Sequence, residues 1–224
     1  MDIKSIKNDC NLLKDKIIYS GKKSYKLWLE FEETSPCEDI TNDFANIGVD
    51  TLDGRFYGIN TWTFKFLQTA HQNDIKQGEN KNGLYLIPPD LLVKELSREC
   101  IENTISALLK EYELEAHLNC SVFNLKFLDP WESSSQMEDL GDKAKAEIES
   151  TLKPSHQLYG QKFDVLAQRK DKDELLLELE NRALVKVDLN EKAKSDLNFP
   201  TITCYHNEKD FWKNCLKNDI INGK

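Results

Sequence analysis

The sequence lacks long hydrophobic runs, paired cysteines and an export signal. It contains no stretch of about eighteen consecutive apolar residues, so no membrane-spanning helix is predicted. The charged N-terminal segment has no continuous apolar core of the kind found in secretory signals. The six cysteines are scattered and none belongs to a C-x-x-C pair. These features predict reduced thiols in a cytoplasmic protein that does not associate with membranes, and they argue against a structural zinc site.

The motifs of nucleotide binding and hydrolysis are also missing. The nine glycines form neither a G-x-G-x-x-G nor a Walker loop, and there is no G-x-S-x-G nucleophile elbow. The four histidines lie far apart and match no metal-binding motif. We therefore predict no cofactor, no metal and no catalytic residue. A cysteine nucleophile paired with a distant histidine stays open as an alternative.

Basic residues are missing from the most acidic part of the chain. The net charge is −9, and the segment from Glu30 to Asp53 holds eight acidic residues but neither Lys nor Arg. A nucleic-acid ligand is not expected, because binding to phosphates requires clustered Lys and Arg. The natural complement of such a segment is a basic protein partner.

The segment Asp43–Trp62 predicts a β-hairpin. A two-residue turn at Asp53–Gly54 would place apolar side chains opposite polar ones, whereas a three-residue loop, Leu52–Gly54, keeps each face coherent if the glycine is left-handed. We therefore predict the three-residue loop, because a half-buried sheet needs coherent faces. It pairs Val49 with Tyr57, Ile47 with Ile59 and Phe44 with Trp62.

Other elements follow from hydrophobic periodicity. Alternation over Tyr25–Glu33 predicts a strand with one wet, acidic face, and the apolar stripe of residues 91–112 predicts a helix capped by Asp90 and packed on the sheet. A helix is also expected over residues 3–19, and a short one over residues 63–71. Residues 73–83 are expected to form a polar loop.

A change of composition divides the chain. Residues 129–150 carry a net charge of −5 and include Pro130 and three consecutive serines, which predicts an acidic linker with a helix over residues 140–152. We therefore predict an α+β fold: an N-terminal domain (1–128) with an antiparallel sheet and packed helices, then a smaller α+β unit (151–224). Strands of the second unit are expected over residues 163–167, 174–179, 183–189 and 199–205, followed by a helix capped by Asn207.

The candidate binding residues lie in and around the acidic segment. They are Trp28, Glu30 and Glu32 on the wet side of the first predicted strand, with Asp39 and Asp43 after it. Aromatic side chains among carboxylates are typical of protein-binding surfaces, where rigid rings anchor and charge steers. An alternative interpretation is that helix 91–112 covers this face and makes Trp28, Phe44 and Trp62 part of the core.

Two sets of segments resemble a known class of protein. Lys26–Glu32 with Asp53–Trp62, and Ala167–Asp173 with Val185–Leu189, are similar to modules of immunity proteins of bacterial toxin systems, including contact-dependent inhibition. The resemblance implies a cytosolic protein that binds a toxin domain and neutralises it by steric occlusion. It rests on turn and core residues and transfers no site residue. The alternatives are a general adaptor module and an enzyme with a site assembled from distant residues, which a deep pocket with converging polar groups would favour.

Overall fold

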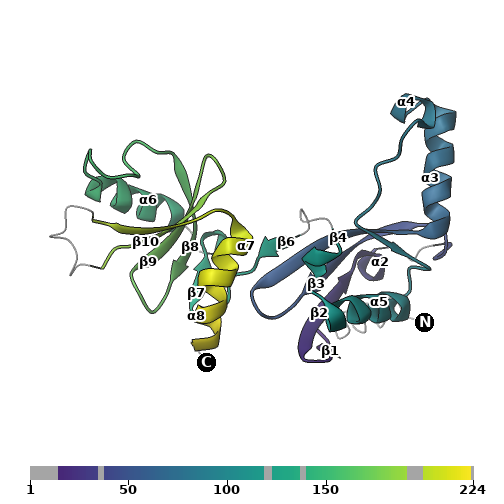
Figure 1. Cartoon of the computed structure of the whole chain (residues 1–224), viewed down its shortest axis with the longest axis horizontal. Coiled ribbons are helices and arrows are strands. Elements are labelled where there is room, and N and C mark those ends of the chain that lie inside the picture. Colours follow the sequence, from purple (N-terminus) through teal and green to yellow (C-terminus); the bar gives the residue numbers. More distant parts are fainter. Residues whose placement is uncertain (1–14, 35–37, 119–122, 137–139, 191–198, 223–224) are drawn as a thin grey trace. The chain divides into compact units, whose positions relative to one another are not determined.

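The computed structural model describes residues 15–34, 38–118, 123–136, 140–190 and 199–222 and divides the chain into two compact units, Met1–Asn124 and Leu125–Lys224 (Figure 1). Each unit combines a sheet with helices, which confirms the predicted α+β class. The boundary falls at residue 124 instead of the predicted 128.

The first unit contains a six-stranded sheet. Its strand order is β1-β2-β3-β4-β5, and β6 also pairs with β4. Neighbouring strands in the main path run antiparallel, except that β5 is parallel to β4. The strands are β1 (Ile18–Ser20), β2 (Lys23–Leu29), β3 (Phe44–Asp50), β4 (Arg55–Thr63), β5 (Leu91–Val93) and β6 (Phe123–Leu125).

The hairpin of β3 and β4 has the predicted register. Val49 pairs with Tyr57, Ile47 with Ile59 and Phe44 with Trp62. The loop is the predicted one, because the N–H of Thr51 donates to the carbonyl of Arg55 across 3.1 Å. Gly54 has a φ of 90°, as this turn requires, and Leu52 also has a positive φ of 60°, which the sequence did not predict.

Helix α5 (Arg98–Glu111) covers one face of this sheet. Its Ile101, Ile105 and Leu109 are buried against side chains such as Leu27 and Ile47. The predicted helix began too early, because Leu91–Val93 pair with β4 as strand β5. Ser97 is the actual cap and accepts the N–H of Cys100 across 3.2 Å, whereas the carboxylate of Asp90 accepts the N–H of Asn60.

Three further boundaries in the first unit differ from the prediction. Strand β2 ends at Leu29, and Glu30–Glu33 form the short helix α2. Most of the helix expected over residues 3–19 lies outside the described residues, but its end was wrong, because Ile18–Ser20 pair with β2 as strand β1. Helix α3 (Phe64–Gln77) is longer than predicted, and α4 (Asn80–Gly83) replaces the end of the expected loop. The turn after α5 is the short 3₁₀ helix η1 (Leu114–Ala116).

The second unit is a five-stranded antiparallel meander in the order β11-β10-β9-β8-β7. The four predicted strands and the final helix are confirmed, and Asn207 caps that helix by accepting the N–H of Asp210. The strands are β7 (Trp131–Ser133), β8 (Phe163–Arg169), β9 (Glu174–Leu179), β10 (Leu184–Asp188) and β11 (Thr201–Tyr205). The helical segments are η3 (Ser134–Gln136), α6 (Leu140–Thr151), α7 (Glu208–Phe211), the π-helical turn Trp212–Leu216 and α8 (Lys217–Asn222).

Residues 129–150 are part of the second unit and not the predicted linker. Strand β7 pairs with β8, and α6 buries Ala144 and Ile148 in the core beside Phe163. The helix expected over residues 140–152 is α6, and its Asp142, Glu147 and Glu149 lie on its exposed side, so their charge did not indicate a linker.

The C-terminal helical segment packs on the second sheet through aromatic side chains. Phe211 is fully buried, and its ring lies 5.6 Å from that of Trp131 and 5.1 Å from that of Tyr205. Trp131 also donates its indole N–H to Asp219 of α8 across 2.9 Å. None of the helices in the described ranges is long and apolar enough to cross a membrane.

Candidate protein-binding surface

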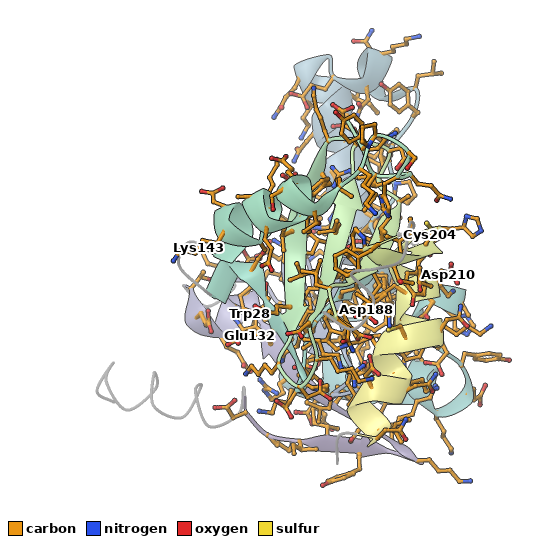
Figure 2. All side chains as sticks on the ribbon, turned by 90° about the vertical axis from the view of Figure 1, so that its left-hand side faces the viewer. Trp28, Glu132, Lys143, Asp188, Cys204 and Asp210 are labelled. Atoms are coloured by element: carbon orange, nitrogen blue, oxygen red, sulfur yellow. The ribbon has the colours of Figure 1, made fainter. Side chains whose placement is uncertain are left out.

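The face of the first sheet opposite α5, termed the outer face, carries the aromatic residues singled out in the sequence. Because side chains alternate along a strand, Leu27 and Leu29 enter the core while Trp28 points to the other side. Phe44 and Trp62 also belong to this face. Helix α5 therefore does not cover them, and the alternative that made all three core residues is wrong. The side chain of Trp28, labelled in Figure 2, is half-buried.

Aromatic and amide side chains gather at one end of the outer face. The ring of Phe66, on the first turn of α3, lies 5.1 Å from that of Phe44 and 5.2 Å from that of Trp62. Phe44 remains 49% exposed. Beside these rings, Asn60 donates its side-chain N–H to the side-chain oxygen of Asn46 across 3.2 Å. This end therefore offers both apolar surface and hydrogen-bonding groups to a partner.

Two glycines face each other in the middle of the outer face. Gly48 on β3 pairs with Gly58 on β4. A Cβ atom on Gly48 would lie 2.9 Å from the ring of Phe56, so this ring occupies the space above Gly48. No atom lies within 4 Å of the corresponding position on Gly58. The backbone at Gly58 is therefore open to close approach by another molecule.

Two of the predicted acidic residues are neutralised by cations from elsewhere in the chain. Arg98 of α5 donates two hydrogen bonds to Glu32, one of 2.7 Å from Nε, and both side chains are 15% exposed. Lys65 lies 2.9 Å from Asp39. Hydrogen bonds from Thr41 and Lys65 lower the pKa of Asp39 to about 2. The negative charge of each acid is therefore balanced by a nearby cation.

The other two predicted acids are held by neutral donors. Glu30 accepts the backbone N–H of Asn46 across 2.8 Å and its side-chain N–H across 3.0 Å, which places the carboxylate beside the outer face. Asp43 accepts the N–H of Phe44 across 2.8 Å. In the described ranges neither carboxylate pairs with a Lys or Arg, so both negative charges remain available. Of the predicted set, the structure thus places Trp28 on the outer face and Glu30 beside it, holds Glu32 and Asp39 in ion pairs with Arg98 and Lys65, and leaves Asp43 at the start of β3.

Two buried arginine clusters escaped the sequence-based search. Arg55, with a side chain only 4% exposed, lies 2.7 Å from Asp53 of its own loop and 2.6 Å from Glu113. In the second unit, Arg169 lies 2.7 Å from Asp171 and 2.8 Å from Asp219. Each cluster fixes a hairpin end to a helical segment. In the sequence, each cluster could have been recognised from an acidic residue two positions away from the arginine, Asp53 beside Arg55 and Asp171 beside Arg169.

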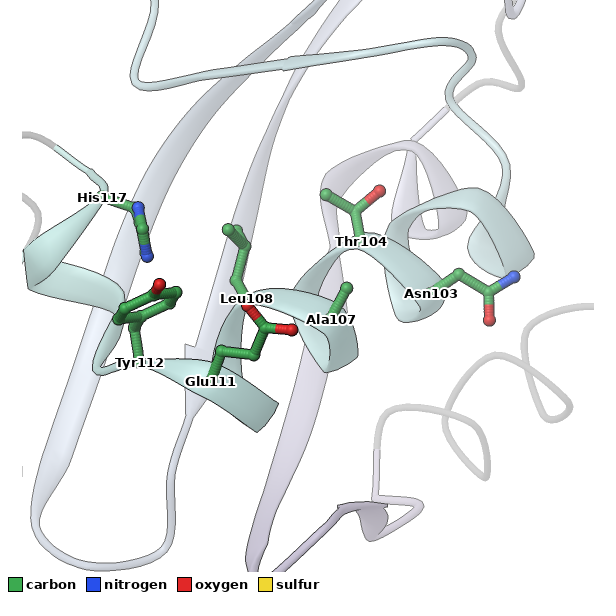
Figure 3. Close-up of a pocket in the computed structure, with 7 residues that line it drawn as sticks. All are labelled: Asn103, Thr104, Ala107, Leu108, Glu111, Tyr112 and His117. Carbon is green, nitrogen blue, oxygen red and sulfur yellow. The ribbon is translucent and has the colours of Figure 1, made fainter.

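A hollow of about 590 Å³ lies along α5 (Figure 3). The rings of Tyr112 and His117 meet edge to face there, with centroids 4.4 Å apart. Most of its lining side chains are exposed, so the hollow does not enclose a small molecule. Among the described residues, no group of three His, Cys, Asp or Glu side chains could hold a metal ion. The thiols of Cys100, Cys204 and Cys215 are free.

The outer face thus combines exposed aromatic and amide groups with the carboxylate of Glu30. The resemblance to immunity proteins stays a prediction, because comparison of the chain with protein-family models, curated proteins and solved structures finds no match.

Proposed function

We propose that the protein is an immunity protein that binds a cognate toxin domain in the cytoplasm and blocks it by steric occlusion. One observation carries this proposal: the outer face of the first sheet exposes aromatic and amide groups next to the carboxylate of Glu30, which pairs with no Lys or Arg in the described ranges. Such a combination suits protein recognition, in which rigid rings supply contact area and the surrounding charge favours encounter.

The partner is expected to be basic at its contact surface. Glu30, beside the outer face, and Asp43, at the start of β3, pair with no Lys or Arg of the described ranges, and the chain as a whole carries a charge of −9. Long-range attraction between opposite charges raises the association rate and weakens as salt screens it. Contact at Trp28 and Phe44 would then hold the complex once it has formed.

Affinity capture tests this proposal. The tagged full chain would be expressed in its native cell, and bound proteins would be identified at low and at moderate salt. We expect one stoichiometric partner with a basic domain, held more weakly at the higher salt. Cells that express this domain should survive only when the immunity protein is co-expressed. Several sub-stoichiometric partners would instead favour an adaptor, and the absence of any partner would count against both and call for metabolite screening for an enzyme.

Charge reversal locates the surface. With the captured partner, Glu30→Lys combined with Asp43→Lys should slow association by about tenfold at low salt and flatten its salt dependence. Asp164→Lys combined with Glu147→Lys, at exposed positions of β8 and α6, is the matched control, because it reverses the same number of charges, and it should change the rate far less. Trp28→Ala should mainly accelerate dissociation. Equal rates for the Glu30 and Asp43 variant and for the control would remove the outer face from the interface.

A further inference from the structure

A segment of the first unit, termed the arm, extends away from the sheet. It comprises α3, α4 and the extended residues 84–90 that return to β5, and Figure 1 shows α3 and α4 standing clear of the strands. None of the fourteen residues of α3 is fully buried. Since most helices in proteins are stabilised by packing one face into a core, a helix without a buried residue is an unusual feature.

The tip of the arm is held in a strained backbone conformation. Asn80, Lys81, Asn82 and Gly83 all have positive φ values, so α4 is a left-handed turn. Such a conformation is unfavourable for Lys81 in particular. It is fixed by the side-chain N–H of Asn80, which donates to Asp74 across 2.7 Å, and by close packing of Gly83 on Ile75. The turn directs residues 84–87 back along the arm.

Residues 84–87 expose apolar side chains, and among them residues 85–87 have backbone N–H and C=O groups that make no backbone–backbone hydrogen bond within the described ranges. Leu84 is 75% exposed, Tyr85 49% and Ile87 73%, and Ile75 beside them is 51% exposed. An extended segment with these properties is a template for pairing with a second extended chain.

The exposed area fits a small interface. At roughly 200 Å² for a large side chain, the four residues expose about 400–500 Å² per chain, which is as large as the biggest apolar patch of a typical monomer. Two such patches facing each other, with a polar rim around them, approach the lower limit of about 1,200 Å² for specific interfaces. Covering the patch would also remove its apolar groups from water.

The net charge of the arm indicates which kind of molecule binds to it. Residues 64–90 contain three lysines and three acidic residues and therefore carry no net charge, whereas the chain as a whole carries −9. A basic partner would find no electrostatic attraction at the arm. Two copies of this chain repel each other through their acidic surfaces, and they can approach with least repulsion where the net charge is zero.

We propose that the arm is a homodimerisation element: two copies associate through a two-fold contact in which Leu84, Tyr85 and Ile87 of each arm cover those of the other. A two-fold contact uses the same patch on both copies, so the patch of each arm is covered by its counterpart on the other. The proposal is independent of the toxin-binding function, because it concerns residues outside the outer face.

Sedimentation analysis of the full chain over a range of concentrations tests the proposal. We expect a reversible monomer–dimer equilibrium with a dissociation constant near the micromolar range, given the small area. The variant Leu84→Asp with Ile87→Asp should raise that constant by at least about 100-fold, because two copies of each apolar contact are lost and four like charges meet. Both side chains are exposed, so the circular dichroism and thermal midpoint of the variant should match those of the wild type.

The matched control is Tyr159→Asp with Ile221→Asp. It adds the same charge at apolar positions of the second unit that are 54% and 61% exposed, and it should leave the equilibrium unchanged. A wild-type chain that stays monomeric to about 100 µM would overturn the proposal. So would a dimer that survives the arm variant, or one that the control disrupts as strongly. A milder variant, Leu84→Ser, should weaken the dimer in the same direction without adding charge.

Discussion

The two sheets differ in how many of their faces are covered. In the first unit, α5 covers one face, and β4 alternates between buried and more exposed residues along its length. In the second unit, α6 contributes to one core cluster while the C-terminal helical segment packs through Phe211, and four consecutive residues of β9, Glu174–Leu177, are buried. The comparison of β4 with β9 teaches that a strand with alternating burial leaves one side of its sheet open at that point, whereas a run of consecutive buried leucines lies between two covering layers.

The largest effect is expected from removing an aromatic side chain that encloses the second sheet. Phe211→Ala should lower the free energy of unfolding by about 3–5 kcal/mol, because it leaves a cavity between Trp131 and Tyr205. Trp28→Ala on the open outer face should cost less than half as much, since that side chain is only half-buried. Urea unfolding followed by circular dichroism measures both, and equal losses would contradict the distinction between the sheets.

The next largest effect concerns the ion pairs of the first unit. Arg98→Ala should destabilise the fold by about 1–3 kcal/mol, because it leaves the largely buried carboxylate of Glu32 without its partner and leaves Glu102 only the pair with Lys16. Lys65→Ala breaks the exposed pair with Asp39 and should leave the urea midpoint within error. If both variants behave alike, burial does not separate the two pairs.

A smaller effect on the free energy of unfolding is expected in alkaline solution, where the buried Cys215 of the second unit titrates. Burial, together with the nearby Asp219 carboxylate, raises the pKa of Cys215 from its ordinary value of 9 to about 11. The folded thiol therefore keeps its proton where the unfolded one loses it. The stabilisation that the protonated Cys215 thiol contributes to the free energy of unfolding is fully present below pH 9 and is lost as the pH rises toward 11.

Urea unfolding of the wild type and of Cys215→Ala at about pH 8 and pH 10 isolates this contribution. The wild type should lose roughly 1 kcal/mol more than the variant over this interval. Alkylation at the lower pH, read by peptide mass, should modify exposed Cys204, labelled in Figure 2, well before Cys215. Parallel losses in the two proteins, or equal alkylation rates, would show that Cys215 is not enclosed.

The smallest effect compares the paired glycines of the outer face. Gly48→Ala should destabilise the fold by about 1 kcal/mol, because the new methyl group displaces the ring of Phe56. Gly58→Ala meets no atom and should be neutral or stabilising by about 0.5 kcal/mol, as alanine has less freedom to lose. The midpoints of thermal unfolding of the two single variants measure this difference. A lower midpoint for Gly58→Ala than for the wild type would show that the outer face is covered at this point.

Local patterns predicted the parts of the fold that depend on neighbouring residues. The register of the β3–β4 hairpin followed from keeping Ile47 and Ile59 on one face, and the strands of the second unit followed from turns close to them. The start of α5 could not be predicted in this way, since Asp90 and Ser97 are both good caps. The parallel pairing of Leu91–Val93 with β4, thirty residues back, decided between them.

The sequence predicted the aromatic side chains of the candidate site, but it did not predict which of the acidic side chains are paired with cations. Glu30–Asp53 contains no Lys or Arg, yet Arg98, Lys65 and Arg55 reach Glu32, Asp39 and Asp53 from outside this segment. Arg98 lies 66 residues from Glu32 along the chain, so only the folded sheet brings them together. Charge counted along a sequence therefore overstates the charge that a surface presents.

The chain order of the second sheet also bears on how fast each unit folds. In the second sheet, β8, β9 and β10 are joined by short loops, which close at a small entropic cost, whereas residues 134–162 separate β7 from β8. In the first sheet, β3 and β4 are likewise joined by a short loop, whereas β5 returns to β4 past the whole arm and β6 past α5. Because contacts form more slowly as the contacting residues become more distant in sequence, the hairpins of both units are expected to form before β5, β6 and β7 join their sheets.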